Sequence, residues 1–221
     1  MKPYPKIETL FARGADFVVD PSLLKNPAYG CIKEWVVTEK VDGMNIRVSF
    51  TKGVDAVRIG GRSDNASIPA DLVARLNDLF PKEKMEALLY PDAELGTEIT
   101  LYGEGFGGSI QKGGAYGLQK DFILFDIRLA FVDGHEVWLP DSAVTEYANS
   151  VGCKRVPILN PAMPLESIVE FVRVGFQSLV AESPKIAEGI VGRPAVPLFD
   201  AGGKRIILKL KTSDFHPGVK R

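Results

Sequence analysis

Residues 39–45 read Glu-Lys-Val-Asp-Gly-Met-Asn, and this stretch decides how the chain is interpreted. Apolar and polar residues alternate on both sides of it, over 35–37 and 46–50, which predicts strands on either side of a turn at Gly43. A lysine at a strand end followed by Asp-Gly has two interpretations. One is a solvated lysine beside a hairpin turn, because Asp-Gly is a common turn pair. The other is a reactive lysine presented by a tight turn.

The composition is that of a globular protein. The 221 residues are 45% hydrophobic and 25% charged, which excludes a disordered or collagen-like chain. The length predicts a single domain over residues 1–221. The net charge of -1 shows no global basic field of the kind that marks many nucleic-acid binders. The C-terminal stretch is locally basic, with one acid, Asp214, among Lys204, Arg205, Lys209, Lys211, Lys220 and Arg221.

Cysteine usage and hydropathy disfavour two further classes. Cys31 and Cys153 are far apart and only two histidines are present, so a zinc site is not expected. The N-terminus has no apolar signal-peptide core, and no apolar run reaches the roughly 18 to 20 residues of a membrane span. We therefore expect no membrane partner and a cytoplasmic location.

A glycine-rich segment imitates a nucleotide-binding motif. Residues 103–108 satisfy G-x-G-x-x-G, but the glycines of 109–117 leave no helix to receive a pyrophosphate. Gly203-Lys204 is followed by Arg205 instead of Ser or Thr, so a phosphate-binding P-loop is also absent. Neither dinucleotide nor P-loop chemistry is expected.

The remaining pattern predicts an α+β fold of mostly antiparallel sheets, because strands come in runs and not in strict alternation with helices. Apolar spacing predicts helices over 69–80, 85–89, 140–151 (closed by Gly152) and 165–180. Alternation predicts further strands at 54–59, 99–102, 122–127, 137–139, 189–192 and 205–210, with a glycine-rich loop over 103–117.

Several short signals follow Lys40 in a fixed order. They are Arg62 after a strand, Glu104 in Leu-Tyr-Gly-Glu-Gly-Phe-Gly-Gly, Phe125 in Phe-Ile-Leu-Phe-Asp-Ile, Glu188-Gly189-Ile190-Val191, and Lys209-Leu210-Lys211. In this order the chain resembles the covalent nucleotidyltransferase superfamily of ATP-dependent ligases and capping enzymes, from Trp35 to Phe215. Asn45, five residues after the lysine, resembles RNA ligases of the RNA ligase 2 type, whereas DNA ligases and capping enzymes usually have arginine there. The resemblance implies an ATP-grasp-like nucleotidyltransferase core flanked by helices, with no appended OB-fold in this chain.

The resemblance implies an ATP-dependent RNA ligase that joins 3'-hydroxyl and 5'-phosphate ends through lysyl-AMP on Lys40 and an adenylated RNA. A lysine with the ordinary pKa of about 10.4 is protonated at pH 7, so the site must favour the neutral amine. Lys209 and Lys211 would act as neighbouring positive charges and neutralise the α-phosphate. An alternating Lys-Leu-Lys is otherwise typical of a solvated edge strand.

The resemblance also implies the other site residues. Lys40, Lys209, Lys211 and Glu188 would be catalytic, and Asp42, Glu104 and Glu188 would face Mg²⁺ or Mn²⁺, which keeps most of its waters. The nucleotide contacts would come from Glu39, Lys40, Val41, Asn45, Arg62, Glu104, Phe125, Glu188, Val191, Lys209 and Lys211. Phe125 and Val191 would stack on the two faces of adenine. Taken singly, each acid is more commonly a surface carboxylate, and an aromatic residue in a strand, such as Phe125, is more commonly a core side chain.

The expected partners are ATP, RNA ends (nicked or single-stranded) and an accessory protein in place of the C-terminal domain that many relatives append. Two alternatives stay open. One is DNA ligation or a capping-type nucleotidyl transfer. The other is a nucleotide- or RNA-binding module without turnover, against which the complete set of lysines and glutamates argues.

Overall fold

The computed structural model describes residues 1–15, 19–111 and 113–216 of the chain and divides it into two compact units. Unit 1 comprises Met1–Pro5 and Asp42–Arg155, and unit 2 comprises Lys6–Val41 and Val156–Arg221. Within these described residues, four α-helices and mostly antiparallel sheets confirm the mixed α+β class. The single nucleotidyltransferase domain over 1–221 stays a prediction. No helix in the described part of the chain has the length and apolar character to cross a membrane.

Unit 1 is built on a six-stranded sheet with the order β10-β8-β7-β5-β6, with β9 paired to β8. Its strands are β5 (Met44–Thr51), β6 (Val57–Gly60), β7 (Glu98–Phe106), β8 (Asp121–Ala130), β9 (Glu136–Trp138) and β10 (Lys154–Arg155). All these pairs are antiparallel except β10 with β8. A short 3-10 helix, Gly113–Tyr116, lies in the glycine-rich connection between β7 and β8.

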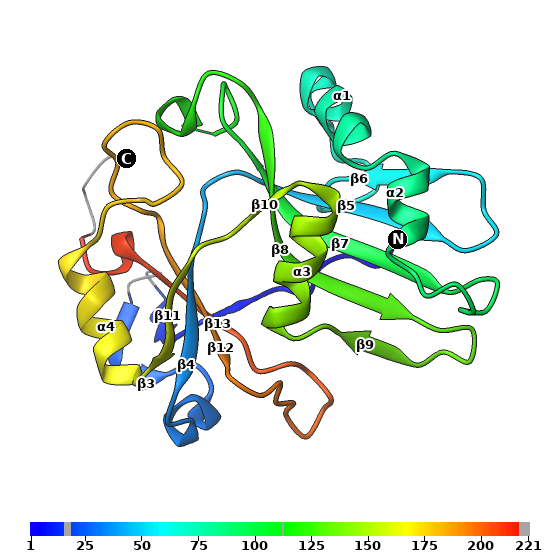
Figure 1. The fold of residues 1–221 in the computed structure, drawn as a ribbon. Coiled ribbons are helices and arrows are strands. Elements are labelled where there is room, and N and C mark those ends of the chain that lie inside the picture. Colours follow the sequence, from blue (N-terminus) through cyan, green and yellow to red (C-terminus); the bar gives the residue numbers. More distant parts are fainter. Residues whose placement is uncertain (16–18, 112, 217–221) are drawn as a thin grey trace. The chain divides into compact units, whose positions relative to one another are not determined.

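Three helices pack on one face of this sheet, α1 (Ala70–Leu79), α2 (Lys82–Ala87) and α3 (Asp141–Val151) (Figure 1). Their apolar residues join the inward side chains of β5, β7 and β8 in a buried core. Successive side chains of a strand point to opposite faces, so the residues between these core positions are presented on the other face of the sheet. That second face carries most of the candidate site residues of unit 1.

The N-terminal segment is tied to this polar side of the sheet. The Arg47 side chain donates to the carbonyl of Met1 at 2.9 Å, and the Tyr102 hydroxyl donates to the carbonyl of Lys2 at 3.0 Å. The Tyr4 hydroxyl donates to Asp126 at 2.7 Å. These bonds explain why Met1–Pro5 belongs to unit 1 although the residues that follow belong to unit 2.

Unit 2 is built on a five-stranded sheet with the order β1-β13-β12-β4-β11, next to a two-stranded pair, β2-β3. The strands are β1 (Glu8–Thr9), β2 (Phe11–Arg13), β3 (Val19–Leu24), β4 (Trp35–Glu39), β11 (Ile158–Met163), β12 (Gly189–Pro194) and β13 (Leu208–Lys211). The helical pieces are α4 (Leu165–Val174) and the 3-10 turns Pro27–Cys31 and Thr212–Asp214. Only β1 with β13 is a parallel pair among these strands.

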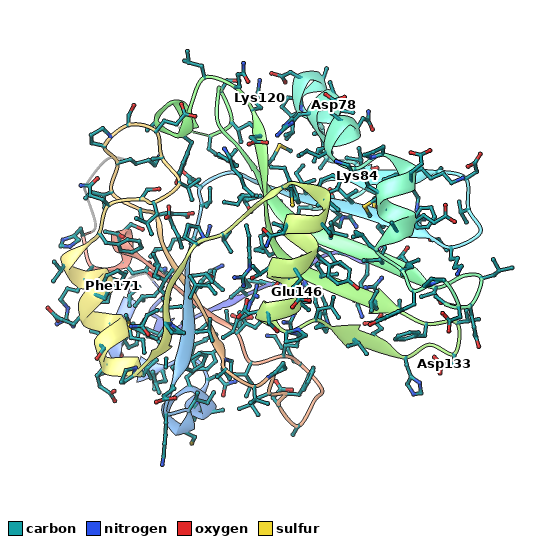
Figure 2. The ribbon with its side chains drawn as sticks, viewed as in Figure 1. Asp78, Lys84, Lys120, Asp133, Glu146 and Phe171 are labelled. Atoms are coloured by element: carbon teal, nitrogen blue, oxygen red, sulfur yellow. The ribbon has the colours of Figure 1, made fainter. Side chains whose placement is uncertain are left out.

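The core of unit 2 lies on one face of its sheet. Trp35 and Val37 of β4 are completely buried there together with Leu208 and Leu210 of β13. α4 contributes Ile168, Val172 and, at the edge of the cluster, Phe171, which Figure 2 labels on this helix. The alternation of leucine and lysine in β13 therefore has a cause, because the leucines enter the core while Lys209 and Lys211 share the other face.

Several sequence expectations are confirmed with shifted ends. The helices over 69–80 and 140–151 appear as α1 and α3, and α3 ends at Gly152 in the left-handed conformation (φ 74°). The helix predicted over 165–180 is wrong beyond residue 174, since Gly175 has φ 81° and ends α4. Phe176 keeps the apolar spacing of the helix although it lies after the helix end. Its ring stacks on that of Phe171 of α4, with ring centroids 4.5 Å apart, and this contact explains why the position is apolar.

Three further expectations are corrected. The strand predicted over 99–102 continues to Phe106, because 103–105 pair with both β5 and β8, so the glycine-rich loop begins later. The strand predicted from Val54 begins at Val57. The turn at Gly43 is not a hairpin, since β4 pairs with β11 and β12 whereas β5 pairs with β6 and β7.

Candidate active site

Lys40 follows the last residue of β4 and is held by both its backbone and its side chain. Its N–H donates to the carbonyl of Gly189 at 2.9 Å, which extends the pairing of β4 with β12 by one residue. Its Nζ lies 2.6 Å from Oε2 of Glu188. The Nζ of Lys211 lies 2.6 Å from Oε1 of the same carboxylate. Glu188 therefore bridges two of the predicted catalytic lysines, which are 171 positions apart in the sequence.

The bridging carboxylate is buried and ionised. The side chain of Glu188 is 4% exposed, whereas those of Lys40 and Lys211 are 23% and 32% exposed. Burial alone would raise the pKa of Glu188, but the charges and hydrogen bonds of Lys40 and Lys211 outweigh it and hold that pKa below the ordinary value of 4.5. A stable anion in this position keeps two ammonium groups together and orients the Lys40 amine.

Strand register places the other predicted residues of unit 2 beside this trio. Val191 pairs with Lys209 on one side and with Thr38 on the other, and Thr38 precedes Lys40 by two residues. All three side chains share the face of the sheet that Lys40 and Lys211 occupy. Lys209 lies between β1 and β12, since Thr9 pairs with it, so the solvated-edge interpretation does not describe its position.

Gly189 separates the two lysines on the sheet and requires the absence of a side chain. It pairs with Lys211, and a Cβ at Gly189 would lie 2.1 Å from the carbonyl oxygen of Leu210. Its φ of 152° is also rarely adopted by residues with a side chain. The Glu188-Gly189 pair thus combines a bridging carboxylate with a position where two strands approach closely.

Glu39 is predicted from the sequence to contact the nucleotide, and the structure gives its side chain other partners. It is 1% exposed and accepts hydrogen bonds from the Ser178 hydroxyl and from the N–H of Leu179, the latter at 2.8 Å. Because side chains alternate along a strand, Glu39 shares the face of Trp35 and Val37, opposite to that of Lys40. Ser178 gave no signal in the sequence.

The remaining motif residues belong to unit 1. Asn45 of β5 lies directly opposite Glu104 of β7, so the two side chains are neighbours on the polar face of the sheet. Oδ1 of Asn45 is buried and has no hydrogen-bond partner among the residues that the structure describes. An unpaired buried acceptor costs free energy, and a ligand that donates a hydrogen bond there would remove the cost.

Gly43 lets the turn approach β7. A Cβ at Gly43 would lie 2.3 Å from the carbonyl oxygen of Gly105 and 2.8 Å from Cγ of Glu104. The backbone of the preceding residue, Asp42, is held by its N–H, which donates to the Tyr116 hydroxyl at 3.2 Å. The glycine therefore brings the backbone beside Asp42 close to Glu104, and Tyr116 is a positioning contact that the motifs did not reveal.

Phe125 lies in an irregularity of β8. Tyr102 pairs with Asp126 and Gly103 pairs with Leu124, so Phe125 is the extra residue of a bulge, and it is half-buried. The edge of the Tyr4 ring meets Phe125, with centroids 4.9 Å apart and an interplanar angle of 74°. In a regular strand, alternation alone would decide the face on which Phe125 lies. The bulge interrupts this alternation and changes the direction of the aromatic side chain.

Arg62 follows β6 and is exposed to solvent. Its connection is held by Arg47, a completely buried residue that the sequence motifs missed. The Arg47 side chain donates to the carbonyl of Gly61 at 2.6 Å and to Asp64 at 2.9 Å. Lys220 and Arg221 of the basic C-terminal stretch lie outside the described residues.

The donors predicted for a divalent cation are distributed over both units. Within 1–15, 19–111 and 113–216, no group of three or more His, Cys, Asp and Glu side chains is arranged to hold a metal ion. Each oxygen of Glu188 already faces an ammonium group, so a cation there would compete with Lys40 and Lys211. Asp42 and Glu104 fit better, because hydrated Mg²⁺ commonly uses only one or two carboxylates and retains several waters.

The family model of RNA ligases matches residues 33–211, which include every motif described above. The chain belongs to the RNA ligase family. No curated protein sequence matches the chain.

Solved structures show the same fold. This RNA ligase family member superposes on a variant of Naegleria gruberi RNA ligase with ATP and manganese, with a TM-score of 0.63, 19% identity and coverage of 100% of this chain and 64% of that one. The Naegleria gruberi RNA ligase with pyrophosphate gives a TM-score of 0.63 at 20% identity, with coverage of 99% of this chain and 64% of that one. An apo variant of Naegleria gruberi RNA ligase R4a gives a TM-score of 0.60 at 21% identity, with coverage of 86% of this chain and 52% of that one. The chain therefore spans about half to two thirds of the length of these relatives.

Proposed function

We propose that this chain is the nucleotidyltransferase core of an ATP-dependent RNA ligase of the RNA ligase 2 type. The proposal rests on one observation above all, the Glu188 carboxylate that holds Lys40 and Lys211 at 2.6 Å each. A solvated lysine beside a turn needs no buried anion and no second lysine. Membership in the RNA ligase family and the likeness to a ligase structure with ATP give this arrangement its chemical meaning.

The first step would be attack by the Lys40 amine on the α-phosphorus of ATP. A phosphorus–nitrogen bond forms, the bond to the β-phosphate oxygen breaks, pyrophosphate leaves and the amine loses a proton. Glu188 is the nearest charged acceptor in unit 2 to the Lys40 ammonium. Lys211, already beside that carboxylate, would place a positive charge where the α-phosphate gains negative charge, and Lys209 on the same face would add to it.

The next steps would transfer the nucleotide and seal the RNA. A 5'-phosphate oxygen of the RNA attacks the lysyl-AMP phosphorus and releases Lys40, and a 3'-hydroxyl then attacks the activated 5'-phosphate and releases AMP. Asp42 and Glu104 would hold a hydrated divalent cation, which supplies charge neutralisation for phosphate oxygens. Phe125, Val191 and Arg62 would contact the nucleotide as the family resemblance implies, and the unpaired Oδ1 of Asn45 would accept a hydrogen bond from a sugar hydroxyl.

The decisive experiment uses ATP labelled at the α-phosphate. The wild type should acquire a covalent, acid-labile label, and intact-mass and peptide analysis should place AMP on Lys40. Lys40→Arg is the sharpest variant, because arginine preserves the ion pair with Glu188 but does not lose its proton near neutral pH. It should fold normally and take no label. A label on another residue of the wild type, or none at all, would overturn the proposal.

A second experiment tests the RNA assignment. The protein should join a pre-adenylated RNA donor to an acceptor that ends in ribose, and deoxyribose at the acceptor end should slow sealing, because the 2'-hydroxyl distinguishes RNA from DNA. Equal sealing of all-DNA and ribose-ended nicks at the same salt concentration would favour the DNA ligase alternative. GTP labelling in place of ATP labelling would favour a capping-type reaction.

A further inference from the structure

The segment between α4 and the bridging glutamate folds back on itself as a hairpin, defined here as residues 176–187. The Ser178 N–H donates to the carbonyl of Lys185 at 2.8 Å, and the Ala187 N–H donates to the carbonyl of Phe176 at 2.9 Å. Gln177 forms an isolated β-bridge with Ile186. The second stem of this hairpin leads directly into Glu188, so any movement of the stem displaces the carboxylate that holds Lys40 and Lys211.

The start of the hairpin is attached to the core of unit 2. Phe176 stacks on Phe171 of α4, the residue labelled on that helix in Figure 2, with an interplanar angle of 23°. Its far end is attached to Thr212, the residue that follows β13, because Thr212 donates through its hydroxyl to the carbonyl of Ala187 at 3.0 Å and through its N–H to the carbonyl of Glu188 at 3.0 Å. Between these two ends, Glu39 is the residue of β4 that bonds to the hairpin.

Glu39 holds the turn of the hairpin through two donors. Its carboxylate accepts from the Ser178 hydroxyl and from the N–H of Leu179. The Ser178 oxygen in turn accepts from the N–H groups of Val180, at 3.2 Å, and Ala181, at 3.1 Å. A carboxylate that is 1% exposed is costly to bury unless hydrogen bonds satisfy it, so this network strongly favours one position of the turn.

The same glutamate is also fixed within β4. Its N–H donates to the carbonyl of Pro157 at 3.1 Å, and it pairs with Ile190 of β12. Lys40 is the next residue in the chain, but its side chain points to the opposite face of the sheet. One buried side chain, Glu39, therefore connects the backbone next to Lys40 with the hairpin that leads into Glu188, on the face away from the Lys40 amine.

We infer that Glu39 is a positioning residue, which sets the distance between Lys40 and Glu188 through Ser178 and the 176–187 hairpin, and that its side chain does not contact the base of ATP. This inference rests on the proposed function, since it assigns Glu39 a part in lysine adenylation. It replaces the direct nucleotide contact expected for the Glu39 side chain from the sequence.

Glu39→Gln tests the inference with little change of shape. The amide can accept from the Leu179 N–H, but its NH₂ then faces a Ser178 oxygen whose acceptor positions are already used by Val180 and Ala181. Ser178→Ala removes that conflict, so the double variant should lose less than the two single losses combined. Glu182→Gln is the matched control, because Glu182 is an exposed glutamate of the same hairpin.

Hydrogen exchange gives a readout that needs no catalysis. In Glu39→Gln the amide of Leu179 and those of Val180 and Ala181 should exchange about 10- to 100-fold faster, the size of one charge-assisted hydrogen bond. Glu182→Gln should leave them unchanged. Unchanged exchange in Glu39→Gln would overturn the inference.

Adenylation kinetics separate positioning from base contact. Glu39→Gln should slow single-turnover labelling about tenfold and leave the ATP concentration for half-maximal rate little changed. The variant should slow labelling by the same factor when ATP is replaced by a purine nucleoside triphosphate that lacks the 6-amino group. If Glu39 contacted the base, the rate loss caused by Glu39→Gln and the rate loss caused by removing the 6-amino group would not be additive. That result would overturn the inference. A wild type that takes no label overturns the proposed function, whereas a labelled wild type matched in rate by Glu39→Gln overturns only the role of Glu39.

Discussion

Lys211→Met should weaken both the fold of unit 2 and the chemistry proposed for Lys40. The substitution preserves the length of the side chain and removes the ammonium that lies 2.6 Å from Oε1 of Glu188. The Glu188 side chain is 4% exposed, so water replaces the lost hydrogen bond to Oε1 poorly. A buried polar group that loses a hydrogen-bond partner destabilises the fold by about 1–3 kcal/mol. Because Lys211 is about one third exposed and water can enter its place, we expect the lower half of this range, about 1–2 kcal/mol.

Urea unfolding at pH 7 measures this loss, with the slope against denaturant required to stay constant so that the midpoint shift reports stability. Lys204→Met is the control. Lys204 makes an ion pair with Glu8 at 3.3 Å, but its side chain is 51% exposed, and such surface pairs contribute about 0–1 kcal/mol. The ion-pair reasoning is refuted if Lys211→Met is no less stable than Lys204→Met.

The chemical effect of the same substitution should be larger than its effect on stability. Loss of one preorganised charge at a reacting phosphate typically slows the step roughly 10²- to 10³-fold. Single-turnover labelling at saturating ATP, at a temperature where Lys211→Met is fully folded, isolates this contribution. A variant that labels at the wild-type rate would return Lys211 to a purely structural role.

Three further outcomes follow from the geometry. Gly43→Ala should lower the free energy of unfolding by about 1–3 kcal/mol in urea titration, because its Cβ meets the Gly105 carbonyl oxygen at 2.3 Å; wild-type stability would contradict this. Glu188→Gln should be less stable than wild type at pH 7, and the difference should shrink as pH falls below 4.5. The lowered pKa of Glu188 means that its ionised form stabilises the fold above pH 4.5, and this stabilisation is lost when the carboxylate is protonated in acid. A pH-independent difference would count against the bridging anion. Asn45→Ala should leave stability at or above the wild-type value, because it removes an unpaired buried acceptor, but it should reduce the rate preference for ribose-ended acceptors; an unchanged preference would separate Asn45 from sugar recognition.

The mixed α+β class was predictable because the decisive patterns are local. Alternation in 208–211 requires only that two leucines enter a core, and the structure buries both completely. The helix from Ala70 to Leu79 follows from apolar spacing and from the proline on each side of it. Helix prediction failed at Gly175, where apolar spacing continued but a positive φ turned the chain out of the helix. Gly175 marks the helix end in the sequence. The apolar residue that follows it, Phe176, packs on α4 and therefore continues the helical spacing.

The sequence motifs named three residues that the structure brings together, but they did not predict the contacts among them, and the roles of these residues stay predictions. The motifs named Lys40, Glu188 and Lys211 because the order of motifs along the chain is itself informative. That one carboxylate bridges both lysines depends on pairing between β4, β12 and β13, which are distant in sequence. Contacts to residues outside the motifs, such as that of Asp42 with Tyr116, have no sequence signal at all.

Glu39 shows where a simple physical rule would have improved the sequence reading. A strand that buries Trp35 and Val37 must also turn the side chain of residue 39 toward the same face, while residue 40 faces the other way. Adjacent positions in a motif therefore need not act on the same ligand. In the roles proposed here, the Lys40 side chain acts from its own face, and Glu39 influences it through the backbone they share and through the hairpin that leads to Glu188.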